Sequence, residues 1–561
     1  MERNTIREYH RWLSAPALPG DLLWELEAIA RDDAAIRDRF CRELEFGTGG
    51  LRGVLGTGTN RMNVITVGKA TQGLSDYLNG LPGQERSVAI AHDSRINSRL
   101  FAVCAARVLA ANGITAHLYP RLEPTPALSY AVRALGCNAG ICITASHNPA
   151  EYNGYKVYGP DGCQITLRAA EQIQQAIGRV DCLEDVKTIS EEEARQKGLL
   201  RDIPETTLDG FVQAVYNQRM PLPDDLPPLK VVYTPLNGTG LECVWRILEK
   251  TGVTEITLVP EQSQPDGNFP TCPYPNPEIR EALKLGLRKC EEVRPDLLLA
   301  TDPDCDRVGV AARDGEEYTL LTGNEVGILL LDFICQSRQT AGTMPKAPVA
   351  VTTIVSTPMA DAIAERYGVE LRRTLTGFKF IGEQIGLLER QREMERYIFG
   401  FEESYGYLSG PHVRDKDGVN AAMLICQMAR WYKARGMNLA QGMRTLYQEF
   451  GYYRSGLHSV VFEGKSGLDT MRNIMDNLRK NHLKRICELD IQAVLDYRQE
   501  IGGLPASNVL EFCLEKGAKV MLRPSGTEPK LKLYLFSRGD SAAEAEIQLE
   551  QLKTGMEEYL K

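Results

Sequence analysis

Asp302, Asp304 and Asp306 alternate along the sequence, shortly after a run of apolar residues. Carboxylates at this spacing on an extended loop can converge on one hard cation. A calcium EF-hand loop would need glycine and glutamate where this chain has Arg307 and Arg313. An acidic surface loop is the alternative, but three close carboxylates repel one another unless a cation relieves them. We predict a Mg²⁺ site, because Mg²⁺ accepts a few carboxylates and leaves room for a phosphate oxygen.

Ser146 follows a second apolar run, at residues 141–143, and is itself followed by His-Asn-Pro. Open α/β sheets bind ligands beyond the carboxyl ends of their strands, so the hydroxyl of Ser146 is expected to point into a site. The alternative is an ordinary turn, since Asn148 can bond its own backbone and Pro149 presets φ. This stretch by itself leaves both interpretations open.

The segment 523–530 reads RPSGTEPK. It offers a guanidinium, two hydroxyls, a flexible glycine and an ammonium, which are the components of a phosphate-binding loop. These groups belong to Arg523, Ser525, Thr527, Gly526 and Lys530. The spacing is not that of a Walker A loop. A solvated turn with an incidental arginine is the alternative.

Two further polar segments follow apolar runs, FGFEESYG at 399–406 and TLTGFKFIG at 374–382. Carboxylates and hydroxyls at a strand end suit a polyhydroxyl ligand, because a site built to bond hydroxyls discriminates strongly. The candidate binding residues are Thr376, Gly377, Lys379, Glu402 and Ser404. Taken alone, each segment is equally consistent with ordinary loop chemistry.

A serine nucleophile, a divalent-metal loop, a hydroxyl-binding loop and a separate phosphate loop together predict phosphoryl transfer on a phosphorylated sugar. This chemistry depends mainly on positioning and on neutralising charge. A hydrolase would need one phosphate pocket. A second pocket is explained if the substrate carries a phosphate at each end in turn.

Short apolar runs alternate with longer helical patterns up to about residue 450, which predicts α/β domains with helices covering the sheets. Beyond residue 450 the alternation is lost. A proline- and acid-rich segment at 220–228 is typical of a linker. We expect four domains: three α/β domains at residues 1–210, 211–321 and 322–450, and a C-terminal α+β domain at 451–561.

The bulk composition narrows the class of protein. A net charge of −9 over 561 residues argues against nucleic acid as a partner, because such binding rests on basic patches. The 14 cysteines form no CxxC pair, which favours reduced buried thiols over a zinc ribbon or a disulfide scaffold. No apolar stretch suits a signal peptide or a membrane span, so we expect a cytoplasmic protein without a membrane partner. Monomer and dimer are both compatible with the sequence.

These motifs resemble those of the α-D-phosphohexomutases, the family that includes phosphoglucomutases and phosphomannomutases. TASHNP at 144–149 is similar to the family's phosphoserine loop, DPDCDR at 302–307 to its metal loop and RPSGTEP at 523–529 to its phosphate loop. The E-x-S of residues 402–404 is similar to its sugar loop. The segments FGTGGLRG, AHDSR, NGYK and PDGNFP fit as well, so the resemblance covers nearly the whole chain.

The resemblance implies four domains around one cleft and a role for each motif. Ser146 would carry the phosphoryl group and bind Mg²⁺ together with the three aspartates, with Arg307 beside them. His147, Lys156 and Arg52 would assist proton movement and charge at the reacting centre. The sugar hydroxyls would be held by Glu402 and Ser404, and the non-reacting phosphate by Arg523, Ser525 and Thr527.

The activity implied is the interconversion of α-D-glucose 1-phosphate and glucose 6-phosphate, with glucose 1,6-bisphosphate as intermediate and activator. After Ser404 this chain has Tyr405 and Gly406, where the dual-specificity branch of the family has Gly-His. In this respect the chain resembles the glucose-preferring members. Cys305 stands where alanine is common. Phosphomannomutase and phosphopentomutase are the alternatives within the family. A non-catalytic phosphosugar-binding relative would be expected to lack the serine or an aspartate, and all are present.

Overall fold

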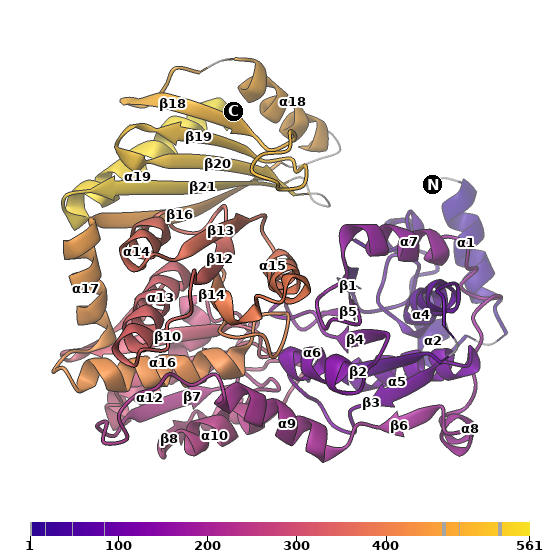
Figure 1. Cartoon of the computed structure of the whole chain (residues 1–561). Coiled ribbons are helices and arrows are strands. Elements are labelled where there is room, and N and C mark those ends of the chain that lie inside the picture. Colours follow the sequence, from indigo (N-terminus) through magenta and orange to yellow (C-terminus); the bar gives the residue numbers. More distant parts are fainter. Residues whose placement is uncertain are drawn as a thin grey trace.

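The computed structural model describes residues 3–16, 18–47, 49–83, 85–462, 467–481, 483–525 and 530–560. Within them the chain forms four sheets in succession (Figure 1). Three are mixed sheets flanked by helices, and the fourth is antiparallel. The predicted fold class, three related α/β domains and a C-terminal α+β domain around a central cleft, is confirmed. The boundaries after residues 210, 321 and 450 stay a prediction.

The first domain has the strand order β1-β5-β4-β2-β3-β6. Its strands are β1 (Gly50–Val54), β2 (Ser87–His92), β3 (Thr115–Leu118), β4 (Ala139–Ile143), β5 (Tyr152–Tyr158) and β6 (Leu200–Asp202). Its helices are α4 (Val64–Asn79), α5 (Ser98–Ala111), α6 (Thr125–Ala134), α7 (Leu167–Ile177) and α8 (Glu191–Gln196). Three helices precede the sheet, α1 (Arg3–Leu13), α2 (Gly20–Ala28) and α3 (Asp33–Phe40), and they share a small apolar core with the fully buried Trp12.

The second domain has the strand order β11-β10-β9-β7-β8. The helix α9 (Glu205–Tyr216), within which the first predicted boundary falls, packs against helices of the first three domains. The strands are β7 (Lys230–Thr234), β8 (Glu255–Leu258), β9 (Leu297–Thr301), β10 (Val308–Asp314) and β11 (Glu317–Leu321). The helices are α10 (Leu241–Lys250), α11 (Pro260–Ser263) and α12 (Lys284–Val293).

The third domain has the strand order β13-β12-β14-β15. The strands are β12 (Val349–Thr353), β13 (Glu370–Thr374), β14 (Tyr397–Glu402) and β15 (Gly406–Leu408). The helices are α13 (Gly323–Thr340), α14 (Met359–Tyr367), α15 (Phe378–Gln391), α16 (Gly418–Lys433) and α17 (Leu439–Phe450). Nearly every residue of α16 is buried, because this helix contacts α9, α10 and β10 as well as its own domain.

The C-terminal domain is a six-stranded antiparallel sheet with two helices. Figure 1 shows it at the top of the molecule, over β12 and β13. The strands are β16 (Tyr452–Val461), β17 (Arg485–Ile486), β18 (Leu489–Asp496), β19 (Leu510–Leu514), β20 (Lys519–Pro524) and β21 (Lys530–Gly539). The helices are α18 (Gly467–Lys480) and α19 (Ala542–Glu557).

One connection recurs in all three mixed sheets. A buried strand that pairs in parallel with one neighbour is followed by a loop and then by its antiparallel neighbour on the other side: β4 to β5, β9 to β10 and β14 to β15. These loops contain the three motif segments around Ser146, Asp302 and Glu403. Each also contains one non-glycine residue with a positive φ, Ser146 (53°), Cys305 (52°) and Tyr405 (64°), a conformation that the surrounding structure must hold.

One large apolar cluster runs through the first three domains, beside separate clusters within the first and the second. The C-terminal domain has a core of its own and meets the third domain across a smaller apolar contact, in which Ile354 and Leu375 face Tyr534 and Phe536. The first three domains are therefore packed as one body, and the fourth rests on it. Among the helices of the described residues, none has both the length and the apolar sequence that a membrane crossing requires.

The predicted linker at 220–228 has no regular structure, as expected, but it is anchored. Arg430 of α16 donates to the carbonyls of Leu226 (3.0 Å) and Pro227 (3.1 Å), and Lys433 Nζ donates to that of Pro228 (2.9 Å). This segment therefore ties the second domain to the third.

Substituting Gly418, the first residue of α16, should destabilise the protein. Its N–H donates to the carbonyl of Cys305 (3.1 Å), and an added Cβ would lie 2.5 Å from that oxygen. Gly418→Ala must push helix and loop apart, at a cost of about 1–3 kcal/mol in the free energy of unfolding measured by urea denaturation.

Gly386→Ala is the matched control, because its Cβ would meet only Arg390 Nη1, at 3.4 Å in α15. It should leave stability unchanged or raise it by up to about 1 kcal/mol. Equal stabilities for the two variants would contradict the close-contact explanation.

Candidate active site

A cleft of about 780 Å³ is lined by residues of all four domains. The predicted site residues that line it are Arg52, Ser146, His147, Lys156, Arg307, Thr376, Gly377, Lys379, Glu402, Ser404 and Arg523. Gly526 and Thr527 lie outside the described residues. The motif segments, hundreds of residues apart in the chain, thus meet at one place.

Ser146 lies just beyond the carboxyl end of β4 and is buried. Its Oγ donates to Asp302 Oδ2 (2.8 Å) and lies 3.1 Å from His147 Nδ1. Thr144 Oγ1 accepts from the Ser146 N–H (2.8 Å), which closes the turn. Residues 144–148 therefore form a turn, and this turn also points the Ser146 hydroxyl at the acidic loop. Both interpretations of the segment, an ordinary turn and a functional serine, are compatible with this geometry.

Asp302, Asp304 and Asp306 are buried, and one oxygen of each lies within 4.8 Å of the others. Burial and the charges of the two neighbours raise the pKa of Asp302. Burial would also raise the pKa of Asp304, but Lys156, the hydrogen bond with Asp302 and the charge of Lys416 together lower it. Asp304 Oδ1 and Asp306 Oδ1 accept no hydrogen bond from the described residues. Buried, repelling oxygens without donors fit a hard cation such as Mg²⁺.

The backbone of this acidic loop is fixed by three domains. Three consecutive carbonyls, those of Pro303, Asp304 and Cys305, accept hydrogen bonds from Thr239 N (2.9 Å), Thr125 N (2.9 Å) and Gly418 N (3.1 Å) respectively. The donors belong to the second, first and third domains. The position of the carboxylates is therefore defined jointly by all three.

Two lysines approach the aspartates from other domains. Lys156 Nζ on β5 donates to Asp304 Oδ2 (2.9 Å), and Lys416 Nζ lies 2.7 Å from Asp306 Oδ2. Burial would lower the pKa of Lys416, but Asp306 and Asp415 raise it above its ordinary value, so this ammonium stays charged. The two ammonium groups place positive charge on the acidic loop that Ser146 contacts.

His147 and Arg52 complete the surroundings of Ser146. Burial, followed by the charges of Arg307 and Arg52, lowers the pKa of His147 to about 2. The imidazole is therefore neutral near pH 7. Arg52 on β1 donates through Nη1 to Asn148 Oδ1 (3.2 Å), within the Ser146 loop.

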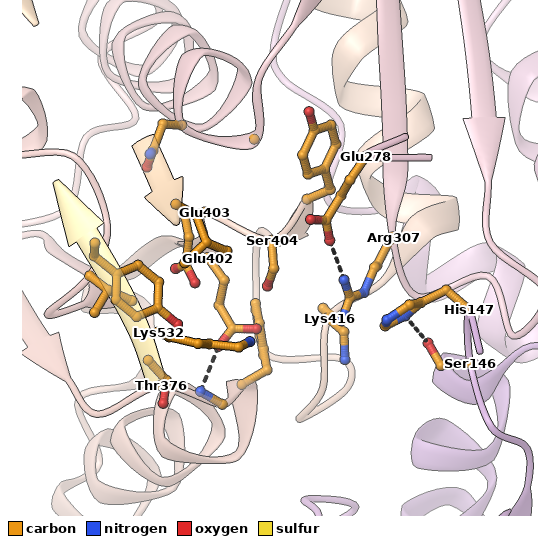
Figure 2. Close-up of a pocket in the computed structure, with 18 of the residues that line it drawn as sticks. Ser146, His147, Glu278, Arg307, Thr376, Glu402, Glu403, Ser404, Lys416 and Lys532 are labelled. Carbon is orange, nitrogen blue, oxygen red and sulfur yellow. Dashed lines mark hydrogen bonds and ion pairs between the residues drawn. The ribbon is translucent and has the colours of Figure 1, made fainter. Parts of the chain in front are cut away.

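Arg307 follows the last aspartate and points into the cleft between Glu278 and the Ser146–His147 pair (Figure 2). It forms an ion pair with Glu278, a residue of the loop that leads to α12. Burial alone would lower the pKa of Arg307, but Glu278 and Asp306 raise it. A charged guanidinium at this place in the cleft is suited to bind a phosphate group.

The sugar-loop residues lie on the opposite side of the cleft (Figure 2). Glu402, the last residue of β14, accepts the N–H of Gly377 through Oε1 (2.8 Å), which joins the two predicted sugar segments. Glu403 points away to Thr353 and Ser356, whose hydroxyls lie 3.0 and 3.4 Å from its Oε2. Of the neighbouring acids, Glu402 and not Glu403 therefore faces the side of Gly377.

The C-terminal domain contributes basic groups. Arg523 at the end of β20 and Lys532 on β21 line the cleft, and they are paired across these strands. The N–H of Ser525 donates to the carbonyl of Lys530 (2.7 Å). Positive charge therefore occurs at two separate parts of the cleft, around Ser146 and on the fourth domain.

Comparison with known proteins agrees with this arrangement. Profiles of the phosphoglucomutase/phosphomannomutase family match in order: alpha/beta/alpha domain I at residues 43–183, domain II at 209–315, domain III at 322–450 and the C-terminal domain at 474–553. The chain belongs to this family.

Relatives within the phosphoglucomutase/phosphomannomutase family include curated bacterial proteins. The chain is 37% identical to a phosphoglucomutase of Staphylococcus aureus strain MSSA476 over 518 residues, which cover 90% of this chain and 91% of the relative. It is 36% identical to a phosphoglucomutase of Staphylococcus haemolyticus over 517 residues, covering 90% and 92%.

Solved structures share the fold. The open form of Paramecium parafusin, a phosphoglucomutase, superposes with a TM-score of 0.67 at 17% identity, covering 92% of this chain and 95% of that one. A phosphoglucomutase/phosphomannomutase family protein of Burkholderia thailandensis gives a TM-score of 0.68 at 17% identity, covering 92% and 96%.

Several cleft residues were not predicted from the family motifs. Lys416 and Glu278 both lie on irregular loops, and no apolar run precedes them to mark a strand end. Lys532 lies on β21, where Lys530 and Lys532 alternate, and the sequence does not indicate which of the two faces the cleft. The only available signal was the lysine between two aspartates in RDKDG, at the start of α16.

The pH dependence of catalysis should report the coupling of Glu402 to Glu403. Burial, and then the charge of Glu403, raises the pKa of Glu402 to about 7. If the ionised carboxylate accepts sugar hydroxyls, kcat/KM falls as the pH is lowered through about 7. Glu403→Gln keeps the shape and removes a charge, so the acidic limb should move to lower pH.

The measurement is a pH profile of kcat/KM for wild type and variant. The substrate phosphate titrates in the same range, with a second pKa of roughly 6, but equally in both enzymes. The difference between the profiles therefore belongs to Glu402, and superimposable limbs would contradict the coupling.

Proposed function

We propose that this chain is a phosphoglucomutase that interconverts α-D-glucose 1-phosphate and glucose 6-phosphate. The observation that carries the proposal is the 2.8 Å contact between Ser146 Oγ and Asp302, which joins a serine of the first domain to the acidic loop of the second. The basic groups on the fourth domain support it, because a mutase must hold a second phosphate away from the reacting one. The similarity to staphylococcal phosphoglucomutases supports glucose as the sugar.

Each half of the reaction moves one phosphoryl group. Phosphorylated Ser146 transfers its phosphoryl group to a free hydroxyl of the sugar phosphate: the bond from Oγ to phosphorus breaks, and one from the sugar oxygen forms. The sugar hydroxyl gives up its proton, and Ser146 regains one. His147 Nδ1 lies 3.1 Å from Oγ, which places the imidazole to assist the movement of that proton. Glucose 1,6-bisphosphate is the intermediate, and transfer of its other phosphate back to Ser146 completes the cycle.

Asp302, Asp304, Asp306 and Ser146 would hold Mg²⁺. When bound, the ion would neutralise charge on the transferring phosphoryl group. Lys156, Arg52 and Arg307 would contribute positive charge from the protein itself, and this fixed charge favours a transition state in which negative charge is spread over the phosphoryl oxygens.

Sugar and distal phosphate are assigned to the third and fourth domains. Glu402 and Ser404, with Thr376, Gly377 and Lys379 nearby, would bind the sugar hydroxyls. Arg523 would bind the non-reacting phosphate together with Ser525, Gly526 and Thr527. The two phosphates of the intermediate must exchange places, so this loop has to accept either end of the sugar.

Ser146→Ala should abolish turnover, because the alanine cannot carry a phosphoryl group. We expect kcat with glucose 1-phosphate to fall at least about 10³-fold, equivalent to roughly 4 kcal/mol. Mass spectrometry after incubation with glucose 1,6-bisphosphate should find phosphate on Ser146 of the wild type and none on that position of the variant.

Ser404→Ala is the control, since it removes another cleft hydroxyl. It should keep phosphorylation at Ser146 and change mainly kcat/KM. Near-normal turnover by Ser146→Ala would rule out the phosphoserine route. Comparing kcat/KM for the 1-phosphates of glucose, mannose, glucosamine and ribose tests the sugar, and a preference for another sugar would overturn the glucose assignment.

Removing the metal should stop the reaction reversibly. Chelation should abolish turnover and added Mg²⁺ should restore it, while Ca²⁺ should bind but support turnover poorly because its geometry is looser. Asp304→Asn should weaken Mn²⁺ binding, measured by electron paramagnetic resonance, by more than the roughly 10- to 100-fold typical of outer-shell partners. Full activity in excess chelator would contradict the assignment.

A further inference from the structure

The backbone conformation of Ser146 is unfavourable by itself and requires support from the rest of the fold. Its φ of 53° lies in the left-handed region, which costs an L-residue roughly 1–2 kcal/mol. A loop free to relax would leave that conformation and swing Oγ away from Asp302. Something in the fold must therefore hold the backbone of this loop.

Arg95, in the turn between β2 and α5, provides that hold. Its guanidinium donates through Nη2 to the carbonyl of Ser146 itself (2.5 Å) and to that of Asn148, and through Nη1 to those of Pro149 (2.8 Å) and Tyr152 (3.0 Å). Three carbonyls of the loop and that of the first residue of β5 thus converge on one planar fork, a geometry that a lysine ammonium cannot reproduce.

The guanidinium of Arg95 is completely buried, so its charge must be balanced inside the protein. Asp93 supplies the counter-charge, with Oδ2 3.4 Å from Arg95 Nε. Asp93 is itself fixed, because its Oδ1 accepts from the Arg95 N–H (2.9 Å) and from Ser98 Oγ (2.7 Å). Asp93 therefore fixes Arg95 from within the turn between β2 and α5.

A second domain covers this arginine. The ring of Phe269, buried and with a φ of 46°, lies 5.0 Å from the Arg95 guanidinium carbon. The neighbouring Gly267 forms a β-bridge with Arg95, and a Cβ on Gly267 would lie 2.5 Å from Ile96 N. The motifs AHDSR and PDGNFP, to which the chemistry assigns no role, therefore meet directly behind Ser146.

We propose that Arg95 and Phe269 are positioning residues that hold Ser146 in its left-handed conformation and aim its Oγ at the acidic loop. Arg95 acts on the carbonyls of the loop, and Phe269 presses the guanidinium against them from the second domain. Neither lines the substrate cleft. The expected changes in kcat and KM rest on the proposed function. The expected change in the conformation of Ser146 does not.

Arg95→Lys keeps the charge and loses the fork. Ser146 should relax, and since a misplacement of about 1 Å can cost on the order of 10²-fold in rate, kcat should fall by about 10- to 100-fold with KM little changed. Phosphorylation of Ser146 by glucose 1,6-bisphosphate in a single turnover should slow by a similar factor. Phe269→Leu, which keeps apolar volume and removes the ring face, should give a smaller fall of the same kind.

Arg86→Lys is the matched control in the same domain. Arg86 also donates to four backbone carbonyls, those of Leu78, Leu81, Gly83 and Glu85, but far from Ser146 in the chain and outside the cleft lining. This variant should lose stability and keep kcat. If Arg95→Lys behaves in the same way, or if Phe269→Leu lowers stability alone, the positioning role is overturned.

A crystal structure of Arg95→Lys separates this inference from the proposed function. It reports the φ of Ser146 directly, whichever phosphosugar is the substrate. An unchanged φ and an unchanged Oγ–Asp302 contact would overturn the inference even in an active phosphoglucomutase. A relaxed loop in a protein that does not convert glucose 1-phosphate would support the inference and reject the function.

Discussion

The side chains of Asp302, Asp304 and Asp306 are buried together, and like charges at this spacing raise the free energy of the folded chain unless cations lie close. Lysine side chains from other domains supply the cations that this cluster requires. Lys156 from the first domain approaches Asp304 and Asp306, and Lys416 from the third approaches Asp306. Because each cation comes from a different part of the chain, the acidic loop is stable only where the three α/β domains meet, and the cleft is formed at that junction.

The loops after β4, β9 and β14 share a topological position, and each also holds its residue of positive φ in the same way. In each, the residue with positive φ has its carbonyl bound by a donor from elsewhere: Ser146 by Arg95, Cys305 by Gly418 N and Tyr405 by Val308 N. A strained backbone next to a reacting group is retained where the surroundings over-determine it. The related domains therefore keep three sharply turned loops in place by the same means, although the donors differ in kind.

The sequence was informative where chemistry follows a buried strand. Ser146, Asp302 and Glu402 each lie at or near the end of a continuous apolar run, and the fold class followed from the alternation of such runs with helical patterns. Lys416 and Glu278 could not be found in this way, because only long-range packing brings their loops to the cleft. The roles of the site residues stay predictions, and those of Gly526 and Thr527 fall on residues that the structure does not describe.

The junction also determines when the site can form during synthesis. The carbonyl of Cys305 can bond the N–H of Gly418, and Asp306 can pair with Lys416, only after these later residues have been synthesised. At roughly 5–20 residues per second, the delay is on the order of ten seconds. Contacts between such distant parts of a chain also form slowly in refolding. The first two domains of the nascent protein therefore carry an acidic loop without its later partners, and the reactive centre is among the last regions to reach its native structure.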